Sequence, residues 1–170
     1  MTLSTQTLTL FAAALLCPLA QAADTPPPPP PTRVAAPAAT AATADKLAGA
    51  RGLIAAKQWP AAIEELKRVN DTASADWNNL MGYSLRKGKT PDLAASEKHY
   101  DEALRINPRH RNTLEYSGEL YLMKGDLDKA QARLETLSAE CAANYEQYAD
   151  LKSSIERYKA AGNKYVPTNW

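Results

Sequence analysis

Cysteine is scarce in this chain, whose 170 residues include only Cys17 and Cys141. Cys17 falls in an N-terminal segment that we expect to be removed, so the mature protein keeps one cysteine and has no internal disulfide. Cys141 follows an apolar helical stripe, where a lone cysteine is more often a small core residue than a reactive thiol. A redox role for Cys141, or a contact with a second chain, is the alternative.

The chain also lacks an excess of either charge, with 20 lysines and arginines against 19 aspartates and glutamates. A surface dedicated to nucleic acid needs clustered positive charge to meet the phosphates. The balance therefore argues against nucleic acid as a partner. We interpret the short basic run at 105–111 as a solvated loop.

No catalytic or metal-binding signature is present in the sequence. His99 and His110 are eleven residues apart and have no ligand partners at a metal-binding spacing. The serine-hydrolase, zinc-protease and phosphate-loop motifs are missing. Glu115 and Glu119 share one helix face and could pair for acid-base chemistry or a metal, but a solvated or ligand-facing surface is the simpler interpretation. We therefore predict a protein that is not an enzyme and has no cofactor and no metal.

The apolar segment at 8–19 is much shorter than the ~20 residues that span a bilayer. It is followed by Ala20-Gln21-Ala22, which offers small residues where a signal peptidase needs them. We predict a signal peptide at 1–22, cleavage after Ala22 and a periplasmic mature protein. Membrane attachment is expected only if Cys17 is lipidated, and Leu16 argues against this because a lipoprotein box needs a small residue there.

Residues 23–44 form a segment rich in proline and alanine, with six consecutive prolines at 26–31. Such a segment has no apolar pattern from which to build a core. A polyproline run extends at ~3.1 Å per residue, so we predict a disordered spacer. A docking site for a proline-recognising partner is the alternative. About 125 residues remain, enough for one domain with a modest core.

The remaining residues carry a repeat of 34 positions. Ala62, Ser96 and Ala130 are spaced by 34 residues. Three further sets share this interval: Trp59, Leu93 and Leu127; Leu66, Tyr100 and Leu134; and Val69, Ala103 and Leu137. Within each unit the steps are three and four residues, which is the spacing of one helix stripe. Units of this kind stack to build a shared core, and the stack usually offers a binding surface.

A second set lies upstream in each unit and marks the first helix of a pair. Ala50, Gly82 and Gly118 occupy its small position. We expect Gly118 to lie where the two helices of a pair approach closely. The segment 88–92 interrupts the helices of the middle unit, because glycine and proline forbid a continuous helix there.

These residues resemble the tetratricopeptide repeat. The best unit, 76–108, supplies the following family positions: Met81-Gly82, Leu85, Ser96 with Tyr100, Ala103 and Pro108. The next unit supplies Gly118, Tyr121, Gly125-Asp126-Leu127, Ala130 and Leu134. Three further segments are similar to small exported bacterial repeat proteins: 79–83, 115–119 and 141–148. In that group a second cysteine follows the first, but Tyr145 stands in its place here.

The resemblance implies an all-α fold, a right-handed superhelical stack of about three helix-turn-helix repeats with a C-terminal capping helix. We predict repeat units at about 45–75, 76–109 and 110–142 within a domain at 45–160. The segment 144–160 has an apolar face that includes Leu151 and Ile155 and is predicted to be the capping helix. Residues 161–170 form a tail.

In such stacks the first helix of each pair lines the concave face. Carrying that geometry over predicts these partner-binding residues: Arg51, Asn79, Tyr83, Arg86, Asn112, Glu115, Tyr116 and Glu119. Arginine, tyrosine and asparagine suit peptide binding because they combine apolar contact with hydrogen bonds. Tyr83, Arg86, Tyr116 and Glu119 are expected to form one surface patch.

The predicted function is a non-catalytic protein-interaction module of the bacterial cell envelope that binds a protein or peptide. The alternative is a structural or assembly protein of the envelope, which acts by self-association through the repeat edges or Cys141.

Overall fold

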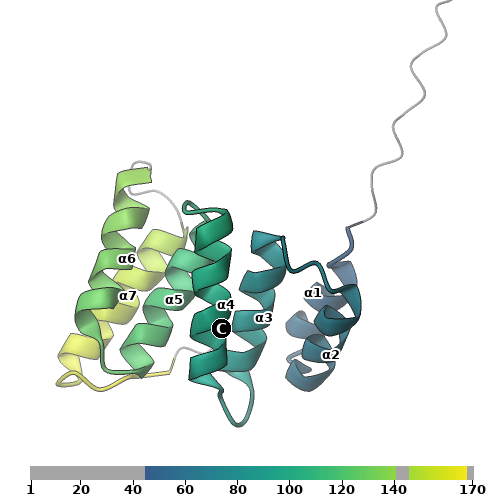
Figure 1. The fold of residues 1–170 in the computed structure, drawn as a ribbon. Coiled ribbons are helices and arrows are strands. Elements are labelled where there is room, and N and C mark those ends of the chain that lie inside the picture. The colour runs from purple at the N-terminus through teal and green to yellow at the C-terminus, as the bar shows by residue number, and fades with distance from the viewer. Residues whose placement is uncertain (1–44, 141–145, 168–170) are drawn as a thin grey trace, which may run out of the picture. The chain divides into compact units, whose positions relative to one another are not determined.

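The computed structural model describes residues 45–140 and 146–167 (Figure 1). The predicted signal peptide, with Cys17, and the proline-rich segment lie outside these residues, as do Cys141 and Tyr145. The described residues form no strand and seven helices: α1 (Ala48–Ala55), α2 (Trp59–Val69), α3 (Ala75–Lys87), α4 (Leu93–Ile106), α5 (Arg111–Met123), α6 (Leu127–Glu140) and α7 (Glu146–Ala160).

Several helices begin at a polar residue that caps the free backbone N–H groups of the first turn. The Ser74 hydroxyl accepts from the Trp77 N–H at the start of α3, and the Asp92 carboxylate accepts from the Ala95 N–H at the start of α4. At α5 the His110 Nδ1 accepts from the Thr113 N–H at 3.2 Å. The sequence therefore encodes where the first turns of α3, α4 and α5 start.

The helices pack as pairs, α1 on α2, α3 on α4 and α5 on α6, and α7 packs against both α5 and α6 (Figure 1). Each pair also contacts the next, since α2 packs on α3 and α4 packs on α5. The first helices are themselves neighbours, because α1 contacts α3, α3 contacts α5 and α5 contacts α7. The chain is thus an all-α stack of helix pairs, and α1, α3, α5 and α7 share one face.

Small side chains at the repeated positions allow this close packing. Ala62, Ser96 and Ala130 are fully buried. A Cβ atom on Gly82 would stand 2.8 Å from the Tyr100 ring of the paired helix α4. Since real Cβ atoms do not approach that closely, only glycine fits there.

Gly118 also lies at a close approach, but the neighbour differs from the prediction. A Cβ on Gly118 would stand 2.6 Å from the Leu151 methyl groups of α7, whereas we expected the partner helix α6 to be the close neighbour. The reason is that α7 packs on α5 more extensively than α5 packs on α3, whereas in the preceding unit the equivalent Gly82 faces its own partner helix α4.

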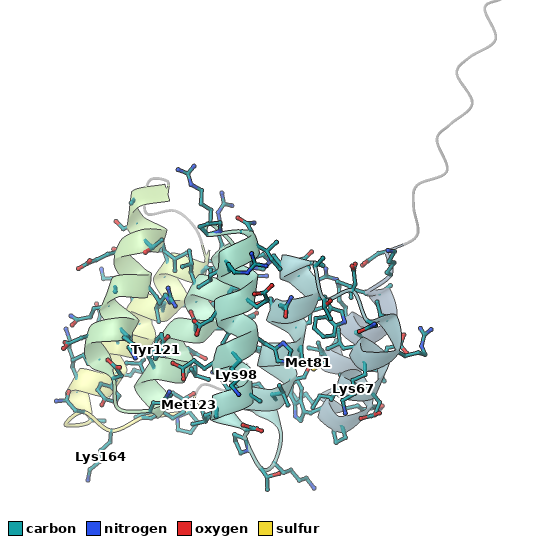
Figure 2. The ribbon with its side chains drawn as sticks, in the orientation of Figure 1. Lys67, Met81, Lys98, Tyr121, Met123 and Lys164 are labelled. Carbon is teal, nitrogen blue, oxygen red and sulfur yellow. The ribbon has the colours of Figure 1, made fainter. Side chains whose placement is uncertain are left out.

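The core has two clusters of buried apolar side chains. One joins α1, α2 and α3 and includes Leu66, Trp77 and Met81. The other joins α4, α5, α6 and α7 and includes Leu120 and Leu151. Met81 lies among the helices, while Lys67, Lys98 and Lys164 extend from them toward solvent (Figure 2). Between the two clusters, where α3 faces α5, several contacts are polar.

Candidate functional site

A row of aromatic rings runs from the start of α2 across α3 to α5. The Trp59 ring meets the Tyr83 ring edge-on at a centroid distance of 5.8 Å. The Tyr83 ring of α3 in turn lies 4.6 Å from the Tyr116 ring of α5. We call Trp59, Tyr83 and Tyr116 the aromatic row. Tyr83 and Tyr116 are partly exposed, so their rings remain accessible from outside the stack.

Beside this row is a cavity of about 370 Å³ between α3, α5 and α7, which we call the acidic hollow. It is lined by Tyr83, Asn112, Glu115, Tyr116, Glu146, Gln147 and Asp150. The lining holds three carboxyl groups and no lysine, arginine or histidine. The Gln147 amide donates to the Asn112 side-chain oxygen at 3.0 Å and so joins α7 to α5 at the rim.

Glu115 is the most deeply placed acid of this hollow, with 5% of its surface exposed. Within residues 45–140 and 146–167 its carboxyl group makes no hydrogen bond and no ion pair. Burial raises the pKa of Glu115 from 4.5 to about 8, and the nearby charges of Glu119 and Asp150 raise it as well. Burial and the charge of Glu146 also raise the pKa of Asp150. The hollow therefore favours the protonated form of Glu115 at neutral pH until a positive charge enters it.

Glu119 lies one turn further along α5, inside the stack. Its Oε2 accepts from the Arg86 Nη1 at 2.7 Å, and both side chains are almost completely buried. Its Oε1 accepts from the Ser154 hydroxyl at 3.1 Å. This ion pair links α3, α5 and α7. The Arg86 guanidinium also lies 5.5 Å and 5.7 Å from the centroids of the Tyr83 and Tyr116 rings.

The burial of Arg86 and Glu119 differs from the surface patch that the sequence suggested. Glu119 accepts from Ser154 of α7, and Arg86 lies against the Tyr83 and Tyr116 rings, so the pair is buried beneath the aromatic row and is not exposed beside it. Of the four residues expected in one patch, Tyr83 and Tyr116 are accessible at the surface. Arg86 and Glu119 form a buried ion pair, and the Arg86 guanidinium packs against both tyrosine rings.

The other predicted residues separate into two groups. Asn112 and Glu115 join Tyr83 and Tyr116 in the lining of the acidic hollow. Asn79 is buried, and its Oδ1 accepts from the Thr113 hydroxyl at 3.0 Å across the α3–α5 contact. Arg51 is exposed and forms ion pairs at 3.4 Å and 3.2 Å with Asp45 and Asp76.

Three residues of the hollow were missed because α7 was interpreted as a cap. Glu146, Gln147 and Asp150 come from this helix. The 34-residue interval would have found them, since Asn112 leads to Glu146 and Tyr116 leads to Asp150. In position, α7 is the first helix of a further unit.

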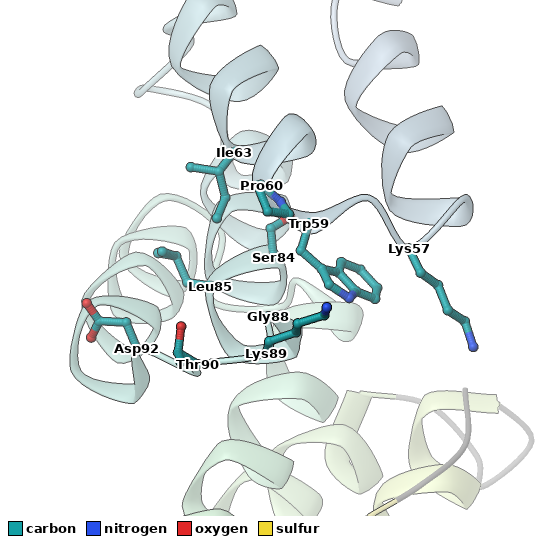
Figure 3. A pocket seen from close by; sticks show the side chains of 10 residues that line it. All are labelled: Lys57, Trp59, Pro60, Ile63, Ser84, Leu85, Gly88, Lys89, Thr90 and Asp92. Carbon is teal, nitrogen blue, oxygen red and sulfur yellow. The ribbon is translucent and has the colours of Figure 1, made fainter.

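A second cavity, of about 390 Å³, lies at the other end of the aromatic row (Figure 3). It is formed by α2, the end of α3 and the α3–α4 turn, and we call it the apolar hollow. Its lining residues are Lys57, Trp59, Pro60, Ile63, Ser84, Leu85, Gly88, Lys89, Thr90 and Asp92. Trp59 belongs both to this hollow and to the aromatic row.

The tail after α7 returns toward the same face. Tyr165 packs against the apolar cluster of α4, α5, α6 and α7. It is also close enough to Tyr83 for the two hydroxyl groups to interact electrostatically. The tail thus passes near the middle of the aromatic row.

Two further classes of site were tested on the described residues. Residues 45–140 and 146–167 contain no group of three or more histidine, cysteine, aspartate or glutamate side chains placed to hold a metal ion. In the same part of the chain, no helix has both the length and the apolar character needed to cross a bilayer.

Comparison with known proteins gives one family. Residues 91–155, from α4 into α7, match the family model described as tetratricopeptide repeat. Searches of curated proteins and of solved structures gave no significant match. Repeats of this family generally mediate protein–protein interactions, bind proteins or peptides and are typically non-catalytic. The family match over residues 91–155 and the packed helix pairs of the described residues together support a protein of the tetratricopeptide-repeat type.

Proposed function

We propose that this protein is a non-catalytic interaction module of the bacterial cell envelope, and that it binds a segment of a partner protein on the face of α3, α5 and α7. The observation that carries this proposal is the aromatic row beside the acidic hollow. Tyr83 and Tyr116 present partly exposed rings from successive repeats, 4.6 Å apart. Aromatic side chains next to a recess commonly anchor protein interfaces, because they bury much area with few rotatable bonds.

The periplasm is the proposed location. Its support is the sequence at 1–22, where a short apolar segment ends in Ala20-Gln21-Ala22. N-terminal sequencing of the protein from the cell envelope is expected to start at Ala23. A mature protein that starts at a lipid-modified Cys17 would replace the soluble periplasmic assignment with a membrane-anchored one.

Site-directed photocrosslinking in cells tests the binding face. The photoreactive amino acid p-benzoylphenylalanine, placed at Tyr83 or Tyr116, is expected to join the protein covalently to a partner. Lys98, which is exposed on α4, is the control position and should give no such product. Equal crosslinking from all three positions would contradict a binding face on α3, α5 and α7. Products that contain two copies of this chain would instead favour the envelope assembly role.

Alanine variants provide the complementary test. Tyr83→Ala and Tyr116→Ala are expected to lower partner capture strongly. Tyr121→Ala is the matched control, because Tyr121 lies on the same helix α5 but contacts Lys129 and Arg133 of α6. The control accounts for any loss of stability that follows from removing a ring. Partner capture that falls equally in all three variants would mean that stability, and not the aromatic row, determines binding.

A further inference from the structure

The acidic hollow is lined by three carboxyl groups, and no basic side chain of the described residues forms an ion pair with Glu115. Glu115 is 95% buried, lines the hollow and has no hydrogen-bond or ion-pair partner in the described residues. The nearest buried cation, Arg86, donates its Nη1 to Glu119. The neighbouring Arg157 of α7 donates to the Ser153 and Ser154 hydroxyl groups. The Glu115 oxygens are not among the fully enclosed side-chain atoms that lack a partner, so they open into the hollow, where a ligand that supplies positive charge could pair with the carboxylate.

The other lining groups suit an organic cation. Glu146 and Asp150 of α7 add two further carboxyl groups. Tyr83 and Tyr116 add two rings, whose faces attract cations. Asn112 and Gln147 add amides that can accept hydrogen bonds at the rim. Ammonium and guanidinium groups use this combination of carboxylate and aromatic partners.

The size of the hollow limits what can enter it. A volume of about 370 Å³ is near the lower end of the roughly 300–1,000 Å³ found for ligand pockets. One long side chain fits this space better than a folded element does. A free carboxylate or a phosphorylated side chain is disfavoured, since the lining has three carboxyl groups and no basic residue.

We propose that the acidic hollow binds a lysine or arginine side chain of the partner segment that lies across the aromatic row. This inference rests on the proposed function and adds the chemistry of the partner to it. The ring of Tyr116 and the carboxyl groups of Glu115 and Asp150 would then surround the cation, while Tyr83 contacts the neighbouring part of the segment.

Binding of a cation in this position is coupled to the loss of a proton from Glu115. The charged groups that face Glu115 are Arg86 from α3, Glu119 from its own helix, and Glu146 and Asp150 from α7. With its pKa raised to about 8, Glu115 is mostly protonated at neutral pH in the free protein. A bound cation favours the carboxylate, so affinity should rise with pH up to about 8 and then level off.

A random peptide library tests the inference in a binding experiment that contains no partner protein. A phage-displayed library of random dodecapeptides is panned on the full chain, and peptides whose capture is lost in Tyr83→Ala are retained. These peptides are expected to share a lysine or arginine. The affinity of one such peptide is then compared with that of its norleucine counterpart for lysine or its citrulline counterpart for arginine.

Two isosteric variants locate the cation. Glu115→Gln removes the buried acid while keeping its size. It should lower the affinity for the basic peptide roughly tenfold or more, because a charged hydrogen bond in a buried site is lost. It should also abolish the rise of affinity between pH 6 and pH 8. Glu135→Gln is the matched control, because it makes the same chemical change at an exposed position on α6 that lies outside the hollow. Asp150→Asn provides a second variant at the rim, and circular dichroism verifies that each variant is folded.

The outcomes separate this inference from the proposed function. Retained peptides without a basic residue, which bind Glu115→Gln as well as the parent protein, would overturn the cation inference and leave the aromatic row as a binding face. Failure to obtain any peptide that depends on Tyr83 would overturn both. An equal loss of affinity in Glu115→Gln and Glu135→Gln would show a general effect of net charge and would also overturn the inference.

Discussion

Glu119 and Glu115 lie one turn apart on α5, and the regions around them show two ways of burying an acid. Around Glu119, Arg86 of α3 and Ser154 of α7 donate to the carboxylate, and three helices are joined. Around Glu115, the same three helices open into the acidic hollow and supply further acids in place of donors. Both residues are at least 95% buried, so burial alone does not distinguish them.

The two regions differ in the hydrogen-bonding capacity that each carboxyl group still has for a ligand. A carboxylate that already has its donors can hold neighbouring helices together but has little capacity for a ligand. A carboxyl group that is buried without donors is a local cost, which a cationic ligand can relieve. The comparison separates a structural pair from a candidate binding group on a single helix. It also predicts opposite effects of breaking the Arg86–Glu119 pair and of neutralising Glu115.

The largest expected effect comes from breaking the buried ion pair. Arg86→Ala leaves the Glu119 carboxylate without its main donor inside the stack, and this should lower the free energy of unfolding by roughly 3–5 kcal/mol. Urea unfolding, followed by circular dichroism, measures the loss.

The double variant Arg86→Met with Glu119→Leu is the control for this prediction. It removes both charges and fills similar volumes, so it should regain most of the lost stability. Recovery is expected also because the Arg86 Nε and Nη2 have no hydrogen-bond partner in the described part of the chain. If the double variant is as unstable as Arg86→Ala, the loss of packing, and not the unpaired charge of Glu119, explains the lower stability.

The next largest effect is expected at the contact of α5 with α7, which lies close to both Glu115 and Glu119. Gly118 lies between Glu115 and Glu119 and faces Leu151 of α7, with room for no Cβ. Gly118→Leu should overfill this contact and destabilise the protein by at least about 1–3 kcal/mol. Gly52→Leu is the matched control on α1, where a Cβ would meet nothing within 4 Å. Equal melting temperatures for the two variants would contradict the close packing of α5 on α7.

A smaller effect, dependent on pH, is expected at Glu115. Its pKa in the folded protein is raised to about 8 from 4.5, so folding favours its protonated form. The stability that this form contributes is complete below about pH 4.5 and is lost as the pH rises through 8. Glu115→Gln should therefore unfold at about the parent temperature at pH 4.5, and roughly 4 °C or more above the parent at pH 9.

Thermal unfolding of both proteins at pH 4.5, 7 and 9 measures this difference. Glu135→Gln, with its exposed position on α6, should follow the parent protein at every pH. A Glu115→Gln variant that is less stable than the parent at pH 9 would show that Glu115, like Glu119, has a stabilising partner.

The smallest effect is expected where charges are exposed. Arg51 pairs with Asp45 and Asp76 at the N-terminal end of the stack, but these side chains are about half exposed. Arg51→Ala should change stability by less than about 1 kcal/mol, because solvent screens such pairs. The same urea unfolding measures it. A loss as large as that of Arg86→Ala would mean that the exposed pair, too, holds helices together.

The 34-residue period was enough to predict the helix pairs and the helices that share one face of the stack. It placed Tyr83, Asn112, Glu115 and Tyr116 on neighbouring first helices, and the structure brings these four residues to one cavity. It failed to predict the depth of Arg86 and Glu119. Periodicity gives the direction of a side chain around its helix axis, but depth depends on how closely the next helix approaches.

The sequence by itself determined the repeat, because small residues at a fixed interval permit only helices that pack closely at those positions. It also determined the caps at Ser74 and Asp92, which act within a few residues of the chain. Only the tertiary structure decided that Glu119 has donors and that Glu115 has none among residues 45–140 and 146–167. Those donors come from α3 and α7, more than 30 residues away along the chain, and the distances between helices depend on every side chain packed between them.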